Sequence, residues 1–187
     1  MEHFYREVEG CFTWPLFYSR LVDELKAKNR PTVGVELGTL NGQSLAYFAV
    51  ECLSKGVDCK IDGVDMRNDN GVAAGNLQSV RSVVRTLHSC LSWDAAKLYE
   101  DESLDFVFID AEHDYKSVTK DIAAWRGKVR KGGLICGHDY SQDYAGLMLA
   151  VTEAFESWSV DRGEKYPGAA NLSPHGRQYF PVWSVRL

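Results

Sequence analysis

Several classes of protein require features that this 187-residue sequence has little of. No apolar run approaches the roughly 20 residues that a membrane-spanning helix needs. Residues 1–4 show no charged-then-apolar signal pattern. Basic residues cluster no further than residues 126–131, and the net charge is −5, which argues against nucleic acid as a partner. We therefore expect a cytoplasmic protein that binds neither membranes nor nucleic acid.

Cysteine is also scarce and has no metal-binding pattern. The five cysteines, at positions 11, 52, 59, 90 and 136, are odd in number and share no Cys-x-x-Cys spacing. A disulfide framework or a zinc site is therefore not expected, and reduced thiols fit a cytoplasmic location. The length is sufficient for one domain with a full core.

Strand and helix patterns alternate along the chain. Strands are predicted at residues 32–37, 60–65, 88–91, 104–110, 134–137, 158–161 and 180–186, and helices at residues 15–28, 43–55, 76–86, 92–99, 115–128 and 144–157. This alternation predicts an α/β fold with a doubly wound, mostly parallel sheet of seven strands. A non-helical link joins the last two strands, so the last strand is predicted to be antiparallel.

Local signals predict where several elements begin and end. Thr13, Ser92 and Asp114 are each predicted to cap the start of a helix. Gly56 is predicted to end the second helix. Residues 131–133, Lys-Gly-Gly, are predicted to form a turn before the fifth strand.

The central feature of the sequence is the stretch at residues 33–44, VGVELGTLNGQS. It predicts a buried strand, a tight turn and a helix start. Gly38 and Gly42 allow the backbone to approach a ligand closely, and the helix start presents free N–H groups. The dinucleotide fingerprint G-x-G-x-x-G is absent here, and Glu36 would repel a phosphate. The turn therefore predicts a small-molecule site that favours a ligand with a cationic group.

Acidic residues follow three other predicted strands. Asp65, Asp110 and Asp139 come at or directly after strand ends. The carboxyl ends of parallel strands form the ligand-binding edge of such a sheet. Asp65 is placed to accept hydrogen bonds from both hydroxyls of a ribose.

Two motifs resemble one known family. The pattern Glu36-x-Gly38-x-x-x-Gly42 resembles the nucleotide-binding turn of class I S-adenosylmethionine (SAM) methyltransferases. The stretches DAEHDY at 110–115 and KGGLICGHDY at 131–140 resemble a bacterial branch of that family, related to catechol-type and antibiotic-sugar O-methyltransferases. The resemblance covers about residues 30–140. It implies a Rossmann-like fold, with an arm and helix at 1–30, a cofactor-binding core at 31–140, and a C-terminal helix and closing strands at 141–187.

The resemblance implies SAM as the cofactor. The residues it places in the cofactor site are Glu36, Gly38, Thr39, Asn41, Gly42, Ser44, Asp65, Met66, Ser92, Trp93 and Asp110. In that family the acidic residue at position 36 lies near the amino acid end of the cofactor, and the stretch that begins at Ser92 contacts the adenine.

The resemblance also implies a catalytic and a metal site. Catechol-type relatives hold Mg²⁺ at positions that match Asp110, His138 and Asp139. A histidine among these residues favours a transition metal over Mg²⁺, or no metal at all. His113 matches the general base, with Asp114 and His138 as rival bases, because a histidine titrates near neutral pH.

The expected function is O-methylation of a small molecule or sugar by direct methyl transfer. The alternatives are an NAD-type oxidoreductase and a methyltransferase-like protein that binds SAM without turnover. The N-terminal arm, residues 1–12, is expected to pack on the domain or to lie over the ligand site, and its aromatic residues are compatible with a homodimer. Residues 162–176 are long enough to form a lid. The aromatic residues considered as walls of an acceptor pocket are Tyr5, Trp14, Tyr140, Tyr144 and Tyr166.

Overall fold

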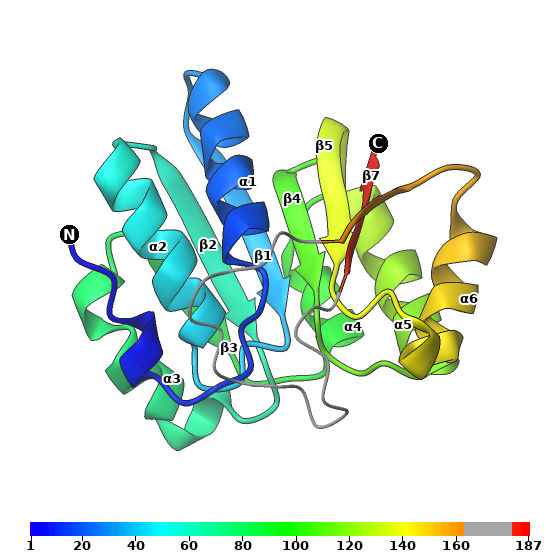
Figure 1. The fold of residues 1–187 in the computed structure, drawn as a ribbon, viewed down its shortest axis with the longest axis horizontal. Helices are drawn as coiled ribbons and strands as arrows, with labels where there is room; N and C mark the ends of the chain where they lie inside the picture. Colours follow the sequence, from blue (N-terminus) through cyan, green and yellow to red (C-terminus); the bar gives the residue numbers. More distant parts are fainter. Residues whose placement is uncertain (163–180) are drawn as a thin grey trace.

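The computed structural model describes residues 1–162 and 181–187. Within these residues, the chain forms one seven-stranded sheet in the order β3-β2-β1-β4-β5-β7-β6 (Figure 1). The strands are β1 (Thr32–Leu37), β2 (Cys59–Val64), β3 (Val84–His88), β4 (Leu104–Ile109), β5 (Val129–Gly137), β6 (Ser159–Asp161) and β7 (Val182–Arg186). Strands β1 to β5 pair in parallel, and β7 is antiparallel to both β5 and β6. The predicted mostly parallel sheet with an antiparallel last strand is confirmed.

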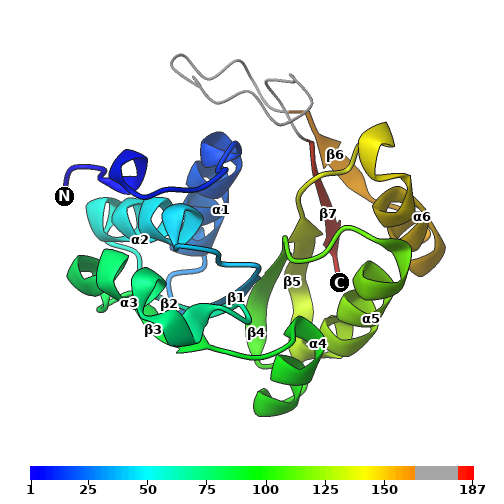
Figure 2. The same ribbon diagram turned by 90° about the horizontal axis from the view of Figure 1, so that it is seen from below.

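Helices cover both faces of this sheet (Figure 2). On one face lie α1 (Pro15–Ala27), α2 (Gln43–Lys55) and α3 (Val72–Asn76), and on the other α4 (Ser92–Ala95), α5 (Tyr115–Trp125) and α6 (Ala145–Ala154). Successive side chains of β4 alternate between the two cores: Phe106 and Phe108 join the first, Val107 and Ile109 the second. A strand covered on both faces is nearly continuously apolar, and β4 has this pattern at every position except Asp105, so the sequence shows it clearly.

Single-turn 3₁₀ helices connect these elements. They are η1 (Tyr5–Glu7), η2 (Asn68–Asn70), η3 (Gln78–Val80), η4 (Ala96–Leu98), η5 (Arg126–Lys128) and η6 (Gln142–Tyr144). In the described part of the chain, none of the helices combines the length and the hydrophobicity that a membrane crossing needs. Residues from 163 onward in the predicted lid, and Tyr166, lie outside the described residues.

The predictions for the second helix are confirmed at both of its ends. Helix α2 spans Gln43–Lys55, and Gly56 takes the left-handed conformation after it, with φ of 66°. The predicted cap of α5 is also confirmed, since the Asp114 side chain accepts hydrogen bonds from the N–H groups of Lys116 and Ser117. These features depend on contacts within one turn of helix, which local sequence encodes.

The segment between β2 and α4 differs from its prediction. The helix predicted at 76–86 is wrong, because α3 ends at Asn76 and β3 begins at Val84. Val84 is β-branched, is buried, and pairs with Ile61 of β2. Pairing with a neighbouring strand therefore outweighs the local helical spacing. The third strand accordingly ends at His88 instead of covering residues 88–91.

Two predicted caps are also wrong. Trp14 occupies the cap position of α1, and the Thr13 hydroxyl instead lies 3.0 Å from Nε2 of His138. Ser92 is the first residue of α4, with Leu91 at the cap position and no capping hydrogen bond from a side chain. In the first case a partner far away in sequence has taken the hydroxyl that the local pattern assigned to the helix.

The turn predicted at residues 131–133 is part of a strand. Strand β5 runs continuously through Val129–Gly137. Gly132 has φ of 75°, and the pairing register with β4 shifts between Leu104 and Phe106. The two glycines therefore mark an irregularity within the strand.

Candidate active site

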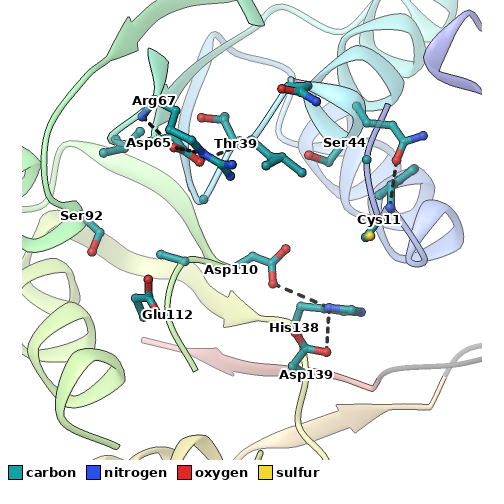
Figure 3. Close-up of a pocket in the computed structure, with 18 of the residues that line it drawn as sticks. Cys11, Thr39, Ser44, Asp65, Arg67, Ser92, Asp110, Glu112, His138 and Asp139 are labelled. Atoms are coloured by element: carbon teal, nitrogen blue, oxygen red, sulfur yellow. Dashed lines mark hydrogen bonds and ion pairs between the residues drawn. The ribbon is translucent and has the colours of Figure 1, made fainter. Parts of the chain in front are cut away.

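A cavity of about 840 Å³ lies at the carboxyl ends of the parallel strands. Its walls come from the turn after β1, the loops after β2 and β4, the end of β5 and the N-terminal arm. Strand β1 lies between β2 and β4, so the crossovers leave β1 in opposite directions at this point. Such a switch point opens a crevice for ligands in doubly wound sheets. Figure 3 shows the side chains that converge on it.

The turn after β1 has an unusual backbone. Gly38 and Gly42 both have φ of 87°, and Leu40 between them has φ of 49°. A Cβ atom at position 38 would overlap the carbonyl oxygen of Asp110, so only glycine fits this contact between two backbone segments. A leucine at positive φ is costly and is retained only where surrounding contacts enforce it. The turn is therefore held in a shape that the chain would not adopt locally.

Asp65 supplies one of those contacts. Its Oδ2 accepts a hydrogen bond from the Leu40 N–H at 2.8 Å, and its Oδ1 accepts one from the Arg67 N–H at 2.9 Å. The carboxylate lines the cavity (Figure 3). Each oxygen of an ionised carboxylate has two lone pairs. Asp65 thus holds the turn and still has one free acceptor position on each oxygen.

Most residues predicted for the cofactor site line this cavity. They are Gly38, Thr39, Asn41, Ser44, Asp65, Met66, Ser92, Trp93 and Asp110. Gly42 and Glu36 are not among the lining residues of the described chain. The Lys120 ammonium lies 4.3 Å from the centre of the Trp93 ring and stacks on it.

Glu36 lies beneath the turn instead of on the cavity wall. Its side chain is buried and accepts hydrogen bonds from Ser44, at 2.6 Å, and from Tyr18. Burial raises the pKa of Glu36 to about 7, although both hydrogen bonds oppose the rise. The prediction that Glu36 lies near the amino acid end of a cofactor stays a prediction, although its carboxylate is not part of the cavity wall. Its visible role is to join α1 and the start of α2.

The other end of the cavity holds two carboxylates and an imidazole. One ligand-type atom each of Asp110, His113 and Asp139 lies within 4.8 Å of the others. Nε2 of His113 is 2.7 Å from Oδ2 of Asp139 and 3.6 Å from Oδ1 of Asp110. Asp139 has φ of 61°, and such strained backbone often occurs at functional sites. Of the three predicted metal ligands, Asp110 and Asp139 belong to this group, and His113 joins them as a further imidazole.

His138 approaches the same carboxylates from the buried side. Its Nδ1 lies 3.3 Å from Asp139 and 3.7 Å from Asp110 (Figure 3). Its Nε2 is within hydrogen-bond distance of Thr13, and its ring packs on Trp14 at 4.1 Å. These contacts on both nitrogens make His138 a link between the carboxylate pair and the segment that leads into α1.

The carboxylates change the protonation of both histidines. Burial by itself lowers the pKa of His113, but the hydrogen bonds and negative charges of Asp110 and Asp139 outweigh it and raise this pKa to about 10. The same balance raises the pKa of His138 to about 9. The two carboxylates therefore favour the cationic form of both rings. His113 becomes a proton acceptor only where another positive charge offsets the carboxylates.

Of the two rival bases, His138 lines the cavity but is buried. Asp114 does not line the cavity, and its side chain caps α5. The aromatic walls are also fewer than predicted. Tyr5, Trp14 and Tyr144 line the cavity, whereas Tyr140 packs on Trp158 at 6.1 Å.

Several other residues line the cavity that were not among the predicted site residues. These are Arg6, Glu9, Gly10, Cys11 and Phe12 of the arm, together with Gln43, Arg67, Leu91 and Glu112. The arm was expected to pack on the domain or to lie over the ligand site; in the structure Tyr5 and Val8 are buried, and other arm residues line this cavity. Individual contacts of the arm depend on which backbone groups the fold brings near it, and no local motif encodes that.

Comparisons with known proteins agree with this architecture. A family model described as a methyltransferase domain matches residues 35–140. Among curated proteins, none matches the chain. Similar solved structures include a putative O-methyltransferase from Klebsiella pneumoniae, with 20% identity, a TM-score of 0.68 and coverage of 96% of this chain and 82% of that one. An O-methyltransferase from Bacillus cereus in complex with SAH has 17% identity, a TM-score of 0.66 and coverage of 97% and 86%.

A third similar structure is a SAM-dependent O-methyltransferase from Thermotoga maritima. It has 16% identity and a TM-score of 0.65, and the match covers 96% of this chain and 68% of that one. At such identities these structures establish the fold, while the family match extends over more than half of the chain. The chain belongs to the methyltransferase domain family, and its fold is that of the class I, SAM-dependent methyltransferases.

Proposed function

We propose that this enzyme transfers the methyl group of SAM to a hydroxyl oxygen of a small molecule or sugar. The observation that carries the proposal is the single cavity that joins the turn after β1 and Asp65 to the cluster of Asp110, His113 and Asp139. Methyl transfer needs a cofactor site and an acid–base site side by side, because the acceptor oxygen must reach the methyl carbon in line.

The cofactor would lie along the strand ends. Asp65 would accept the ribose hydroxyls with its free lone pairs, since its carboxylate lines the cavity with both oxygens already oriented by backbone N–H groups. Met66, Ser92 and Trp93 would surround the adenine, and the turn at 38–44 would receive the amino acid portion. The Bacillus cereus relative was solved with SAH, which supports this class of ligand. Bound SAM would supply a methyl group on sulfonium, an activated leaving group.

The acceptor would bind between the arm and the carboxylate–imidazole cluster. There His113 would take the proton of the acceptor hydroxyl once the charge of Asp110 and Asp139 is offset. Asp110 and Asp139 would hold a divalent cation together with Nδ1 of His138, which lies 3.7 Å and 3.3 Å from them and leaves His113 as the base. Such a cation would supply that charge and would lower the pKa of a coordinated hydroxyl.

The proposal that an oxygen atom accepts the methyl group rests on the similar solved structures. Several similar structures are described as O-methyltransferases, whereas one is a 1,6-didemethyltoxoflavin-N1-methyltransferase. The carboxylate and histidine cluster favours oxygen, because a hydroxyl must lose its proton to become a good nucleophile and a neutral amine need not. A homodimer, which the aromatic arm suggested, stays a prediction.

The first test is calorimetric titration of the purified protein with S-adenosylhomocysteine, with NAD as the control ligand. The expected result is micromolar binding of S-adenosylhomocysteine, none of NAD, and loss of binding in Asp65→Ala. Binding of NAD alone would favour the oxidoreductase alternative. Binding of S-adenosylhomocysteine without methylation of any phenol, sugar or amine panel would favour the non-catalytic alternative.

A further inference from the structure

The N-terminal arm forms a wall of the cavity. Its residues 5–6 and 9–12 line the cavity, and Thr13 and Trp14, which follow the arm, line it as well. In Figures 1 and 2 the arm runs past the start of α2 before it enters α1. The arm therefore stands next to the turn that is proposed to receive the cofactor.

The Gln43 side chain makes three of the hydrogen bonds that hold the arm in this place. Oε1 of Gln43 accepts a hydrogen bond from the Phe12 N–H at 2.9 Å. Nε2 of Gln43 donates to the carbonyl oxygens of Tyr5, at 3.2 Å, and Val8, at 2.9 Å. A single amide thus satisfies three backbone groups from both ends of the arm, and its two ends match them as donor and acceptor.

The fit between the arm and this amide is close. A Cβ atom added at Gly10 would lie 2.8 Å from Oε1 and 3.0 Å from Cβ of Gln43. Any larger residue at position 10 would therefore push the amide away from its partners. A second tether comes from the same turn, since Nδ2 of Asn41 donates to the carbonyl oxygen of Glu9 at 3.2 Å.

We propose that Gln43 is a positioning residue that couples the cofactor turn to the acceptor wall. Gln43 is the first residue of α2 and directly follows Gly42, so it is part of the turn that would contact the cofactor. The inference rests on the proposed function in placing the cofactor at this turn. Any ligand that fixes the turn also fixes Gln43, and through Gln43 it fixes the segment that encloses the acceptor. Occupancy of the cofactor site then prepares the acceptor site.

Hydrogen exchange, measured by mass spectrometry on peptides from the arm, tests the coupling without a known acceptor. In the ligand-free protein, Gln43→Ala should exchange the arm amides about tenfold faster than wild type, because three hydrogen bonds are lost. Gly10→Ala should give the same change from the arm side while it retains the glutamine. Gln78→Ala, which removes an exposed glutamine that does not line the cavity, serves as the matched control and should match wild type.

Saturating S-adenosylhomocysteine provides the second half of the test. It should slow exchange of the arm severalfold in wild type and in Gln78→Ala, but not in Gln43→Ala or Gly10→Ala. A purely structural glutamine would not produce this ligand-dependent difference. Coupling between two sites is reciprocal. Gln43→Ala and Gly10→Ala should therefore also bind S-adenosylhomocysteine more weakly, by the factor with which this ligand slows exchange of the wild-type arm.

Three outcomes overturn parts of the reasoning separately. Wild-type exchange in both Gln43→Ala and Gly10→Ala would overturn the role of Gln43. If the variants loosen the arm but S-adenosylhomocysteine binds wild type without slowing exchange of its arm, the coupling is overturned. Absence of S-adenosylhomocysteine binding in wild type would instead refute the proposed function, and the ligand-free comparison would still decide the role of Gln43. Should Gln43→Ala fail to fold, the isosteric Gln43→Glu replaces it, since it keeps the acceptor for Phe12 and loses the donor for the two carbonyl groups.

Discussion

The buried acid in α5 leads to a quantitative prediction about stability. Asp121 has no exposed surface, and neither of its carboxylate oxygens makes a hydrogen bond of good geometry with the described residues. It lies close to Ser92 at the cavity, and one helical turn later Nε1 of Trp125 donates to the Ser92 carbonyl oxygen at 3.0 Å. Burial raises the pKa of Asp121 from 3.8 to about 7, although Ser92 opposes the rise. The folded state therefore binds this proton more tightly than the unfolded state.

The sign and the size of the effect follow from proton linkage. A raised pKa means that the folded state favours the protonated acid, so this group lowers stability progressively as pH rises from about 4 to about 7. The full cost of ionisation is about 4 kcal/mol, of which about 2.5 kcal/mol falls between pH 5 and pH 8. Asp121→Asn carries no titratable proton. Its free energy of unfolding relative to wild type should therefore increase by about 2.5 kcal/mol over this interval.

Urea unfolding of both proteins at pH 5, 6, 7 and 8 measures the difference. A buried amide without a partner adds a penalty of roughly 1–3 kcal/mol at every pH, so the slope carries the test and the offset does not. Asp69→Asn, at an exposed position, is the control and should show no slope against wild type. A constant difference between Asp121→Asn and wild type from pH 5 to pH 8 would refute the reasoning.

Three further predictions concern the turn, the core and the cluster. Gly38→Ala should lose roughly 3 kcal/mol or more of unfolding free energy in urea titrations, because its Cβ would overlap the Asp110 carbonyl oxygen; a loss below 1 kcal/mol would contradict this. Asp105→Asn should lose about 3 kcal/mol at pH 7, because its buried carboxylate binds Arg30 at 2.6 Å. Burial by itself would raise the pKa of Asp105, but its hydrogen bond with Arg30 lowers this pKa overall. The stabilisation from the carboxylate is therefore lost only on acidification, and the unfolding free energies of wild type and Asp105→Asn should converge as pH falls. Mn²⁺ should raise the melting temperature of wild type but not of Asp139→Asn, and equal shifts in both would exclude the cluster as the binding site.

Much of the fold was predictable because it depends on neighbours in sequence. Strand β1, helix α2 and the Asp114 cap lie where the patterns placed them, since periodicity, glycine geometry and capping act over a few residues. Strand β3 was not predictable in the same way, because pairing with β2 decides its state.

The candidate site was also predictable only in part. Its chemistry was readable, because acids that follow parallel strands must meet at one edge of the sheet. That reasoning brought Asp65, Asp110 and Asp139 to the cavity, where the structure places all three. It did not reveal that burial removes Glu36 from the cavity wall, since exposure depends on what packs above a residue.

The roles of the two histidines required the tertiary structure. The resemblance placed His138 with the metal ligands, and its Nδ1 lies near Asp110 and Asp139. Its contact with Thr13, 125 residues away in sequence, and the approach of His113 to the same carboxylates are visible only in the structure. The contact between Gln43 and the arm is of the same kind, over 31 to 38 residues. Sequence patterns specify which groups are available and on which strand ends they lie. The direction in which each side chain points, and therefore its partner and its charge state, results from packing between segments that are distant along the chain.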